Sequence, residues 1–135
     1  MQAPLESHVT LLVVDDDLVA QARMNAYFSK EGYRVLLAGD GESFWRQLAQ
    51  GEVDLVLLDI NLPGRSGLDV LHVLKEEGSS LRVLVVSMYP EDQYAIRAMR
   101  AGAYGYVNKG GEPAQIVQAV RTVSQGRKYV TPDMA

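Results

Sequence analysis

Residues 9–17 have the sequence VTLLVVDDD, in which an apolar run rich in valine and leucine leads directly into three aspartates. Short apolar runs of this composition favour buried β-strands. Three further runs each lead toward one polar residue: residues 53–58 toward Asp59, residues 83–86 toward Ser87, and residues 104–107 toward Lys109. The chain therefore places carboxylates, a hydroxyl and an ammonium group after four predicted strands.

Helical segments separate these strands, and this alternation is typical of a parallel sheet built from βαβ units. We predict strands at 9–14, 34–38, 53–58, 82–86 and 104–107, and helices at 18–31, 41–50, 67–77, 91–101 and 113–125. In such a sheet the ligand crevice lies outside the carboxyl ends of the strands. We therefore expect the polar residues that follow the strands to converge on one site.

Local signals support the helix boundaries. Asp17 is suited to cap the first helix at its N-terminus, and Gly32 is suited to follow its C-terminus. Pro113 fits the first turn of the last helix, where its missing N–H costs nothing. Pro63-Gly64 predicts a turn after the third strand.

The composition bounds the class of protein. The chain has 135 residues, of which 47% are hydrophobic, enough for one well-filled core. A net charge of −4 opposes non-specific attraction to nucleic acid, and the lack of cysteine excludes disulfides and thiolate metal sites. The chain lacks a secretory signal at residues 1–7 and an apolar run near the ~18 residues of a membrane span. We expect a cytoplasmic protein that enters no membrane.

Four motifs in order resemble the receiver domain of two-component response regulators. They are Val13-Val14-Asp15-Asp16, Leu57-Leu58-Asp59-Ile60-Asn61-Leu62-Pro63-Gly64, Val85-Val86-Ser87 and Tyr106-Val107-Asn108-Lys109. The resemblance covers roughly residues 9–125. It implies an α/β fold of the flavodoxin-like or CheY-like type, a doubly wound five-stranded parallel sheet of order 2-1-3-4-5 with five helices.

Residues 102–110, followed by residues 126–130, further resemble the NarL/LuxR type of response regulator. In that type a helix-turn-helix DNA-binding domain follows the receiver. The resemblance implies a receiver at 8–126, with 127–135 as the start of a linker to an output domain that this chain lacks. Contact with DNA would then occur only through that output domain.

The resemblance also assigns roles at the site. Asp59 would accept a phosphoryl group from a sensor histidine kinase in the presence of Mg²⁺ (or Mn²⁺). The implied ligands of this ion are Asp59, Asp16, Asp15 through a water, and the Asn61 main-chain carbonyl. An ionised carboxylate needs no general base, only charge neutralisation and in-line positioning. Lys109 and Ser87 can bind the phosphoryl oxygens. Apart from self-phosphorylation and slow autodephosphorylation, we expect no enzymatic activity.

A switch follows from the same resemblance. Ser87 would draw its loop toward the phosphoryl group, and Tyr106 would turn from exposed to buried, which reshapes the surface of the fourth helix, fifth strand and fifth helix. A phosphorylation-dependent homodimer is a further expectation. Met88 and Tyr89, directly after Ser87, are expected to narrow access to the phosphoryl site. Receivers often have a cis proline after the lysine, but this chain has Gly110.

Two alternatives remain open from the sequence. Residues 15–19 also satisfy the Asp-x-Asp-x-Val pattern of haloacid-dehalogenase-type phosphatases, in which Asp15 would be the nucleophile and Asp17 the general acid. That interpretation leaves Asp59 and Asn61 unexplained and lacks a later acidic metal-binding pair. The other alternative is a docking module that works without phosphorylation, against which the intact acids and Lys109 argue.

Overall fold

The computed structural model describes residues 9–62, 65–88 and 91–129. Its main sheet contains the parallel strands β1 (Thr10–Val14), β2 (Arg34–Ala38), β3 (Leu55–Leu58), β6 (Arg82–Ser87) and β7 (Gly105–Asn108). The helices are α1 (Leu18–Lys30), α2 (Gly41–Ala49), α3 (Gly67–Glu76), α4 (Glu91–Arg100) and α5 (Pro113–Ser124). The strand order β2-β1-β3-β6-β7 confirms the predicted order 2-1-3-4-5.

Two short strands were not predicted. The two-residue strands β4 (Asn61–Leu62) and β5 (Arg65–Ser66) pair antiparallel directly after the site strand β3. Strands this short carry no hydrophobic periodicity that a sequence pattern could reveal. The turn predicted at Pro63-Gly64 lies outside the described residues. β3 itself begins at Leu55, two residues later than expected.

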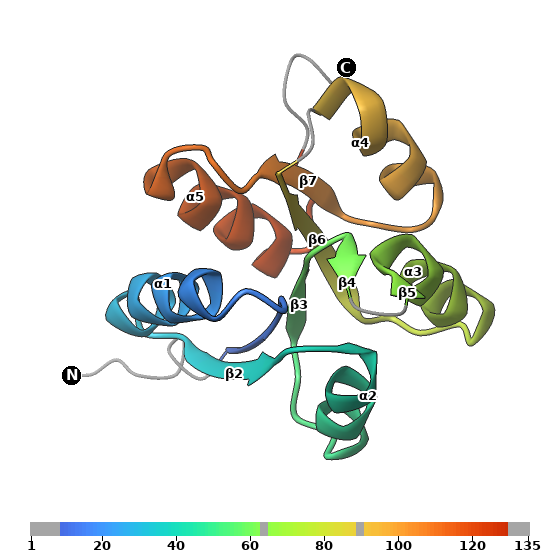
Figure 1. Ribbon diagram of the computed structural model, residues 1–135, viewed down its shortest axis with the longest axis horizontal. Coiled ribbons are helices and arrows are strands. Elements are labelled where there is room, and N and C mark those ends of the chain that lie inside the picture. Colours follow the sequence, from blue (N-terminus) through green and yellow to red (C-terminus); the bar gives the residue numbers. More distant parts are fainter. Residues whose placement is uncertain (1–8, 63–64, 89–90, 130–135) are drawn as a thin grey trace.

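Helices cover both faces of the sheet, with α1 and α5 on one face and α2, α3 and α4 on the other (Figure 1). Neighbouring strand residues serve opposite faces: Leu12 and Val14 pack toward α2, α3 and α4, whereas Leu11 and Val13 pack toward α1 and α5. Because both faces are covered, the middle of each of these five strands is apolar, and their polar residues occur at the strand ends. This arrangement leaves the carboxyl ends of the strands as the place where polar residues gather.

The predicted helix boundaries are confirmed at three ends. The Asp17 carboxylate accepts the Val19 N–H at 2.9 Å and caps α1, which makes it a structural residue of the helix start. Gly32, just beyond α1, has φ +94°, a backbone angle that residues other than glycine rarely adopt. Pro113 occupies the first turn of α5.

Tyr129, which follows the end of α5, lies against the edge of the sheet. The Tyr129 N–H donates to the Tyr104 carbonyl at 2.8 Å, and Tyr129 forms a β-bridge with Gly105 on the outer edge of β7. A Cβ on Gly105 would lie 3.0 Å from the Tyr129 Cβ and 2.9 Å from the Leu84 Cδ1, so glycine permits this close approach. Within the described residues, the chain therefore contacts the sheet again at Tyr129.

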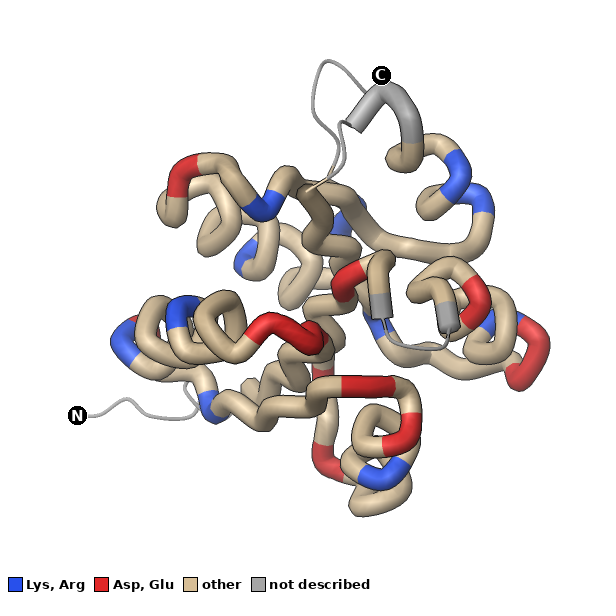
Figure 2. The backbone as a smooth tube through the Cα atoms, in the orientation of Figure 1, with Lys and Arg blue, Asp and Glu red and all other residues tan. Residues whose placement is uncertain are grey.

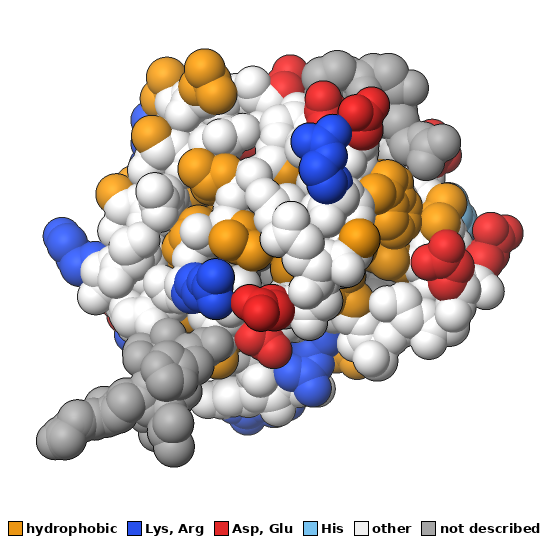
Figure 3. Space-filling model, turned by 90° about the horizontal axis from the view of Figure 1, so that it is seen from below, with side chains coloured by type: hydrophobic (Ala, Val, Ile, Leu, Met, Phe, Trp, Pro, Cys, Tyr) orange, Lys and Arg blue, Asp and Glu red, His pale blue; other side chains and the backbone are white. Residues whose placement is uncertain are grey.

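The surface is mixed in character. On the face seen in Figure 3, hydrophobic side chains lie in small groups between charged and polar ones. None of the helices within the described ranges combines the length and apolar character that crossing a bilayer requires.

Candidate functional site

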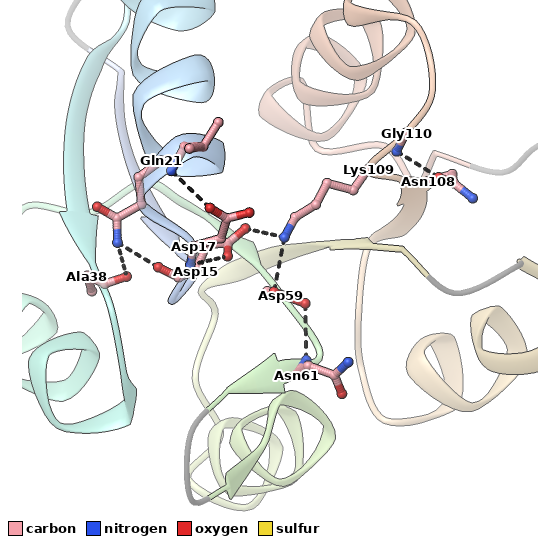
Figure 4. Close-up of polar contacts among 10 residues, drawn as sticks. Asp15, Asp17, Gln21, Ala38, Asp59, Asn61, Asn108, Lys109 and Gly110 are labelled. Carbon is pink, nitrogen blue, oxygen red and sulfur yellow. Dashed lines mark hydrogen bonds and ion pairs between the residues drawn. The ribbon is translucent and has the colours of Figure 1, made fainter.

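The carboxyl ends of β1, β3 and β7 bring together Asp15, Asp59 and Lys109 (Figure 4). In the parallel register Val14 lies opposite Leu58, so the residues that follow them are neighbours. The Asp59 N–H donates to the Val14 carbonyl at 2.9 Å, which extends the ladder by one bond and fixes the Asp59 backbone. Residues 44 positions apart in sequence therefore present their carboxylates to one crevice, as predicted.

Lys109 bridges the two carboxylates. Its Nζ lies 2.6 Å from Asp15 Oδ2 and 3.2 Å from Asp59 Oδ2, and its side chain is only 12% exposed. Burial alone would lower the pKa of Lys109, but the hydrogen bond to Asp15 and the charges of Asp59 and Asp15 outweigh this effect and raise the pKa above its ordinary value. The ammonium group therefore stays charged at neutral pH.

The electrostatic environment of Asp59 opposes its ionisation. Burial raises the pKa of Asp59, and the nearby charge of Asp15 raises it further. Two groups lower it: the Asn61 N–H, which donates to Asp59 Oδ1 at 3.1 Å, and the Lys109 ammonium group. The resulting pKa lies above the ordinary value of an aspartate. The charge of Asp15 is thus one of the causes that raise the pKa of Asp59, after burial. A cation beside this carboxylate would favour its charged form.

Asp15, Asp16 and Asp59 form an acidic cluster, with one carboxylate oxygen from each lying within 4.8 Å of the others. Asp15 and Asp59 are buried and Asp16 is exposed, so the cluster opens to solvent on one side. In Figure 2 the acidic stretch leads into α1. Three hard oxygen donors with an open side fit Mg²⁺, which binds oxygen ligands and keeps several waters. Asp17 is not a member, because its side chain caps α1.

The remaining predicted site residues lie around this cluster. Ser87 is buried at the end of β6, and its carbonyl accepts the Lys109 N–H at 2.7 Å. Tyr106 is fully buried in β7, so the inward orientation is the one that this structure contains. Met88 is 65% exposed, whereas Tyr89 lies outside the described residues. No cis peptide bond occurs in the described ranges, which include Lys109-Gly110.

Two residues that support the site were missed in the sequence. Gln21 of α1 is buried and donates from its amide Nε2 to the Asp15 carbonyl at 2.6 Å. The sequence offered one signal for Gln21: it lies three positions before Met24 and seven before Phe28, a spacing that places it on the same buried helix face. Gly67 lies under Asp59, where a Cβ would come within 2.7 Å of the Asp59 carbonyl oxygen. No sequence pattern marks a close approach of this kind.

Comparison with known proteins supports one family. The model of the response regulator receiver domain matches residues 11–121. The response regulator GacA of Pseudomonas aeruginosa is 36% identical in an alignment of 129 positions that covers 94% of this chain and 60% of GacA. The chain thus spans less than two thirds of the length of the curated relatives it matches first.

Solved structures agree with this match. A LuxR-family two-component response regulator from Aurantimonas sp. SI85-9A1 superposes with a TM-score of 0.85 at 29% identity, covering 94% of this chain and 92% of that chain. The receiver domain of the response regulator TorR superposes with a TM-score of 0.80 at 32% identity, covering 87% of this chain and 98% of that one. The chain belongs to the response regulator receiver domain family and is the receiver domain of a two-component response regulator.

Proposed function

We propose that Asp59 is the phosphoacceptor of this receiver domain. The observation that carries the proposal is the largely buried Lys109 ammonium group, which contacts two members of the three-carboxylate cluster, Asp59 and Asp15. A lysine in this place can form charge-assisted hydrogen bonds to the oxygens of a phosphoryl group on Asp59. The Ser87 hydroxyl, buried at the end of the neighbouring strand, is the second group assigned to those oxygens.

The transfer is a displacement at phosphorus. The proposed donor is a phosphorylated histidine of a sensor histidine kinase. An oxygen of the ionised Asp59 carboxylate attacks phosphorus in line with the bond between phosphorus and the histidine nitrogen. This P–N bond breaks, its electron pair stays on the imidazole, and solvent supplies the proton that the imidazole takes up. The proposed ligands of Mg²⁺ (or Mn²⁺) are Asp59, Asp16, Asp15 through a water, and the Asn61 main-chain carbonyl. When bound, the ion supplies positive charge that offsets the charge on the phosphoryl oxygens.

A sensor histidine kinase is the proposed donor. A hollow of about 360 Å³ adjoins Lys109 between α1 and α5, and apolar side chains such as Val19 and Met88, each 65% exposed, lie along it. An exposed apolar rim around a charged site suits transient contact with a partner. Met88, with Tyr89, is also proposed to limit the approach of water to the phosphoryl group.

The rest of the protein is proposed from its relatives. We propose a receiver spanning residues 8–126, a linker from residue 127, and a helix-turn-helix output domain outside this chain that contacts DNA in the cytoplasm. Ser87 and Tyr106 would carry the signal to the surface formed by α4, β7 and α5, and a phosphorylation-dependent homodimer is part of this proposal. Beyond slow loss of its own phosphoryl group, no catalytic turnover is proposed.

Intact-mass measurement after incubation with acetyl phosphate and Mg²⁺ tests the assignment. The wild type should gain one phosphoryl group and Asp59→Asn none. Asp16→Ala should also fail, whereas Asp17→Ala should still react and should lose only about 1 kcal/mol of stability with its helix cap. Equal uptake by Asp59→Asn would defeat the proposal. Rapid hydrolysis of p-nitrophenyl phosphate that requires Asp17 would favour the phosphatase, and a wild type that takes up nothing would favour the docking module.

A further inference from the structure

Gln21 is a polar side chain on the buried face of α1. Its buried neighbours on the helix are Ala20, Met24 and Phe28, and Gln21 itself is 8% exposed. Burying an amide costs free energy unless the amide is hydrogen-bonded. The partners of Gln21 therefore indicate what the side chain does.

The Gln21 amide holds the end of β1. Its Nε2 donates to the Asp15 carbonyl at 2.6 Å and reaches the Ala38 carbonyl, at the end of β2, at 3.4 Å (Figure 4). The Ala38 carbonyl also accepts the Asp15 N–H at 3.0 Å. The short bond makes the Asp15 carbonyl the main partner. The Gln21 amide thus binds the two carbonyl groups at the point where the backbone hydrogen bonds between β1 and β2 end.

Gln21 also holds the far end of the acidic loop. Its backbone N–H donates to the Asp17 carbonyl at 3.0 Å, the first hydrogen bond of α1. Asp16 lies between the two fastened residues and is exposed. Among the described residues, no hydrogen bond to the Asp16 side chain is formed. The backbone on either side therefore sets where the Asp16 side chain starts and which positions its carboxylate can reach.

We propose that Gln21 is a positioning residue that sets the Asp15 and Asp16 carboxylates for a divalent cation. Because the peptide unit is planar, fixing the Asp15 carbonyl also fixes the plane through the Asp16 Cα. The inference rests on the proposed function, since it concerns the cation that phosphorylation of Asp59 requires. Gln21 touches neither the cation nor the phosphoryl group and acts through the loop.

Glutamine meets the chemical demand of this position. The Asp15 carbonyl accepts a hydrogen bond from the glutamine amide, which supplies N–H donors without adding a charge. Methionine has nearly the same length and no donor. Asparagine keeps the amide but is one methylene shorter, so it would not reach the Asp15 carbonyl in the same way.

Magnesium affinity tests the inference without relying on activity. Isothermal titration calorimetry gives the Mg²⁺ dissociation constant of the wild type, Gln21→Met and Gln21→Asn. Phe28→Leu is the matched control, because Phe28 belongs to the same buried face two turns further along α1, where its ring packs edge-on against Tyr33. Urea denaturation measures the stability of each variant, and acetyl phosphate gives the half-saturating Mg²⁺ concentration and the plateau rate.

The expected result separates positioning from folding. Gln21→Met should raise the Mg²⁺ dissociation constant about tenfold, as the loss of a hydrogen bond behind a metal ligand typically does. Its plateau rate of phosphorylation should stay within about twofold of the wild type at saturating Mg²⁺. Phe28→Leu should lose stability but bind Mg²⁺ as the wild type does, and Gln21→Asn should fall between the wild type and Gln21→Met.

Three outcomes would overturn the inference and leave the proposed function standing. Wild-type affinity in Gln21→Met would do so, and so would wild-type affinity in Gln21→Asn should the methionine variant fail to fold. An equal rise in Phe28→Leu would show that lost stability alone weakens binding. A wild type that binds no Mg²⁺ and takes up no phosphoryl group would instead defeat the proposed function, and the inference with it.

Discussion

Gly67→Ala should strain the backbone that carries Asp59. Gly67 opens α3, and its N–H donates to the Ile60 carbonyl at 2.6 Å. An added Cβ would lie 2.7 Å from the Asp59 carbonyl oxygen and 2.8 Å from the Ile60 Cα. Both neighbours are backbone atoms, so no side chain can rotate away to relieve the contact. Either α3 or the segment after β3 must shift.

The magnitude follows from two opposing effects. Overpacking a tight site by a methyl group costs about 1–3 kcal/mol. Replacing glycine by alanine at a position without strain returns about 0.4–1 kcal/mol, because the unfolded chain loses freedom. The net expectation is a loss of about 1–2 kcal/mol in the free energy of unfolding. Displacement of Asp59 should also slow its phosphorylation.

Gly41→Ala is the matched control. Gly41 is likewise the first residue of its helix, and a Cβ there would meet no atom within 4 Å. Urea denaturation should show Gly41→Ala equal to or more stable than the wild type, with the wild-type rate of phosphorylation by acetyl phosphate. A Gly67→Ala protein as stable and as reactive as Gly41→Ala would refute the reasoning.

Two further predictions concern charge and the sheet edge. Because burial raises the pKa of Asp59, its ionised carboxylate lowers the stability of the metal-free protein at pH 7. Asp59→Asn should therefore unfold at a higher urea concentration than the wild type at this pH. This advantage should shrink as the pH falls through the folded pKa toward about 4, where the wild-type carboxyl becomes neutral as well; an advantage that does not depend on pH would contradict this. Gly105→Ala should loosen Tyr129 from β7 and speed trypsin cleavage after the exposed Arg127 and Lys128, and unchanged cleavage would show that the edge accommodates the methyl group.

The fold could be predicted because its main signals are local. A parallel strand covered on both faces is a continuous apolar run, and each run here ends at a residue of unlike chemistry, as at Val14-Asp15 and Leu58-Asp59. The position of a residue just after a strand is enough to place it at the crevice. This is why the sequence alone sufficed to bring Asp15, Asp59 and Lys109 together.

The features that escaped prediction depend on contacts between distant segments. Gln21 matters because α1 lies over the ends of β1 and β2, and Gly67 because α3 begins against the Asp59 backbone. Tyr129 returns to the edge of β7 after the pattern of α5 has ended. None of these contacts follows from composition or periodicity, since each depends on the packing angle between elements that are separately predictable.

The charge of the site explains why these supports matter. Three carboxylates and the Lys109 ammonium group leave a formal charge of −2 in a crevice that is partly closed to water. A divalent cation would neutralise that charge, and the arriving phosphoryl group would then bring its own negative charge to a site that can accept it. Without such a cation, mutual repulsion pushes the carboxylates apart. The hydrogen bonds that hold the Asp15–Asp17 loop and the Asp59 backbone oppose this movement, so the fold keeps in place an arrangement that electrostatics alone would disperse.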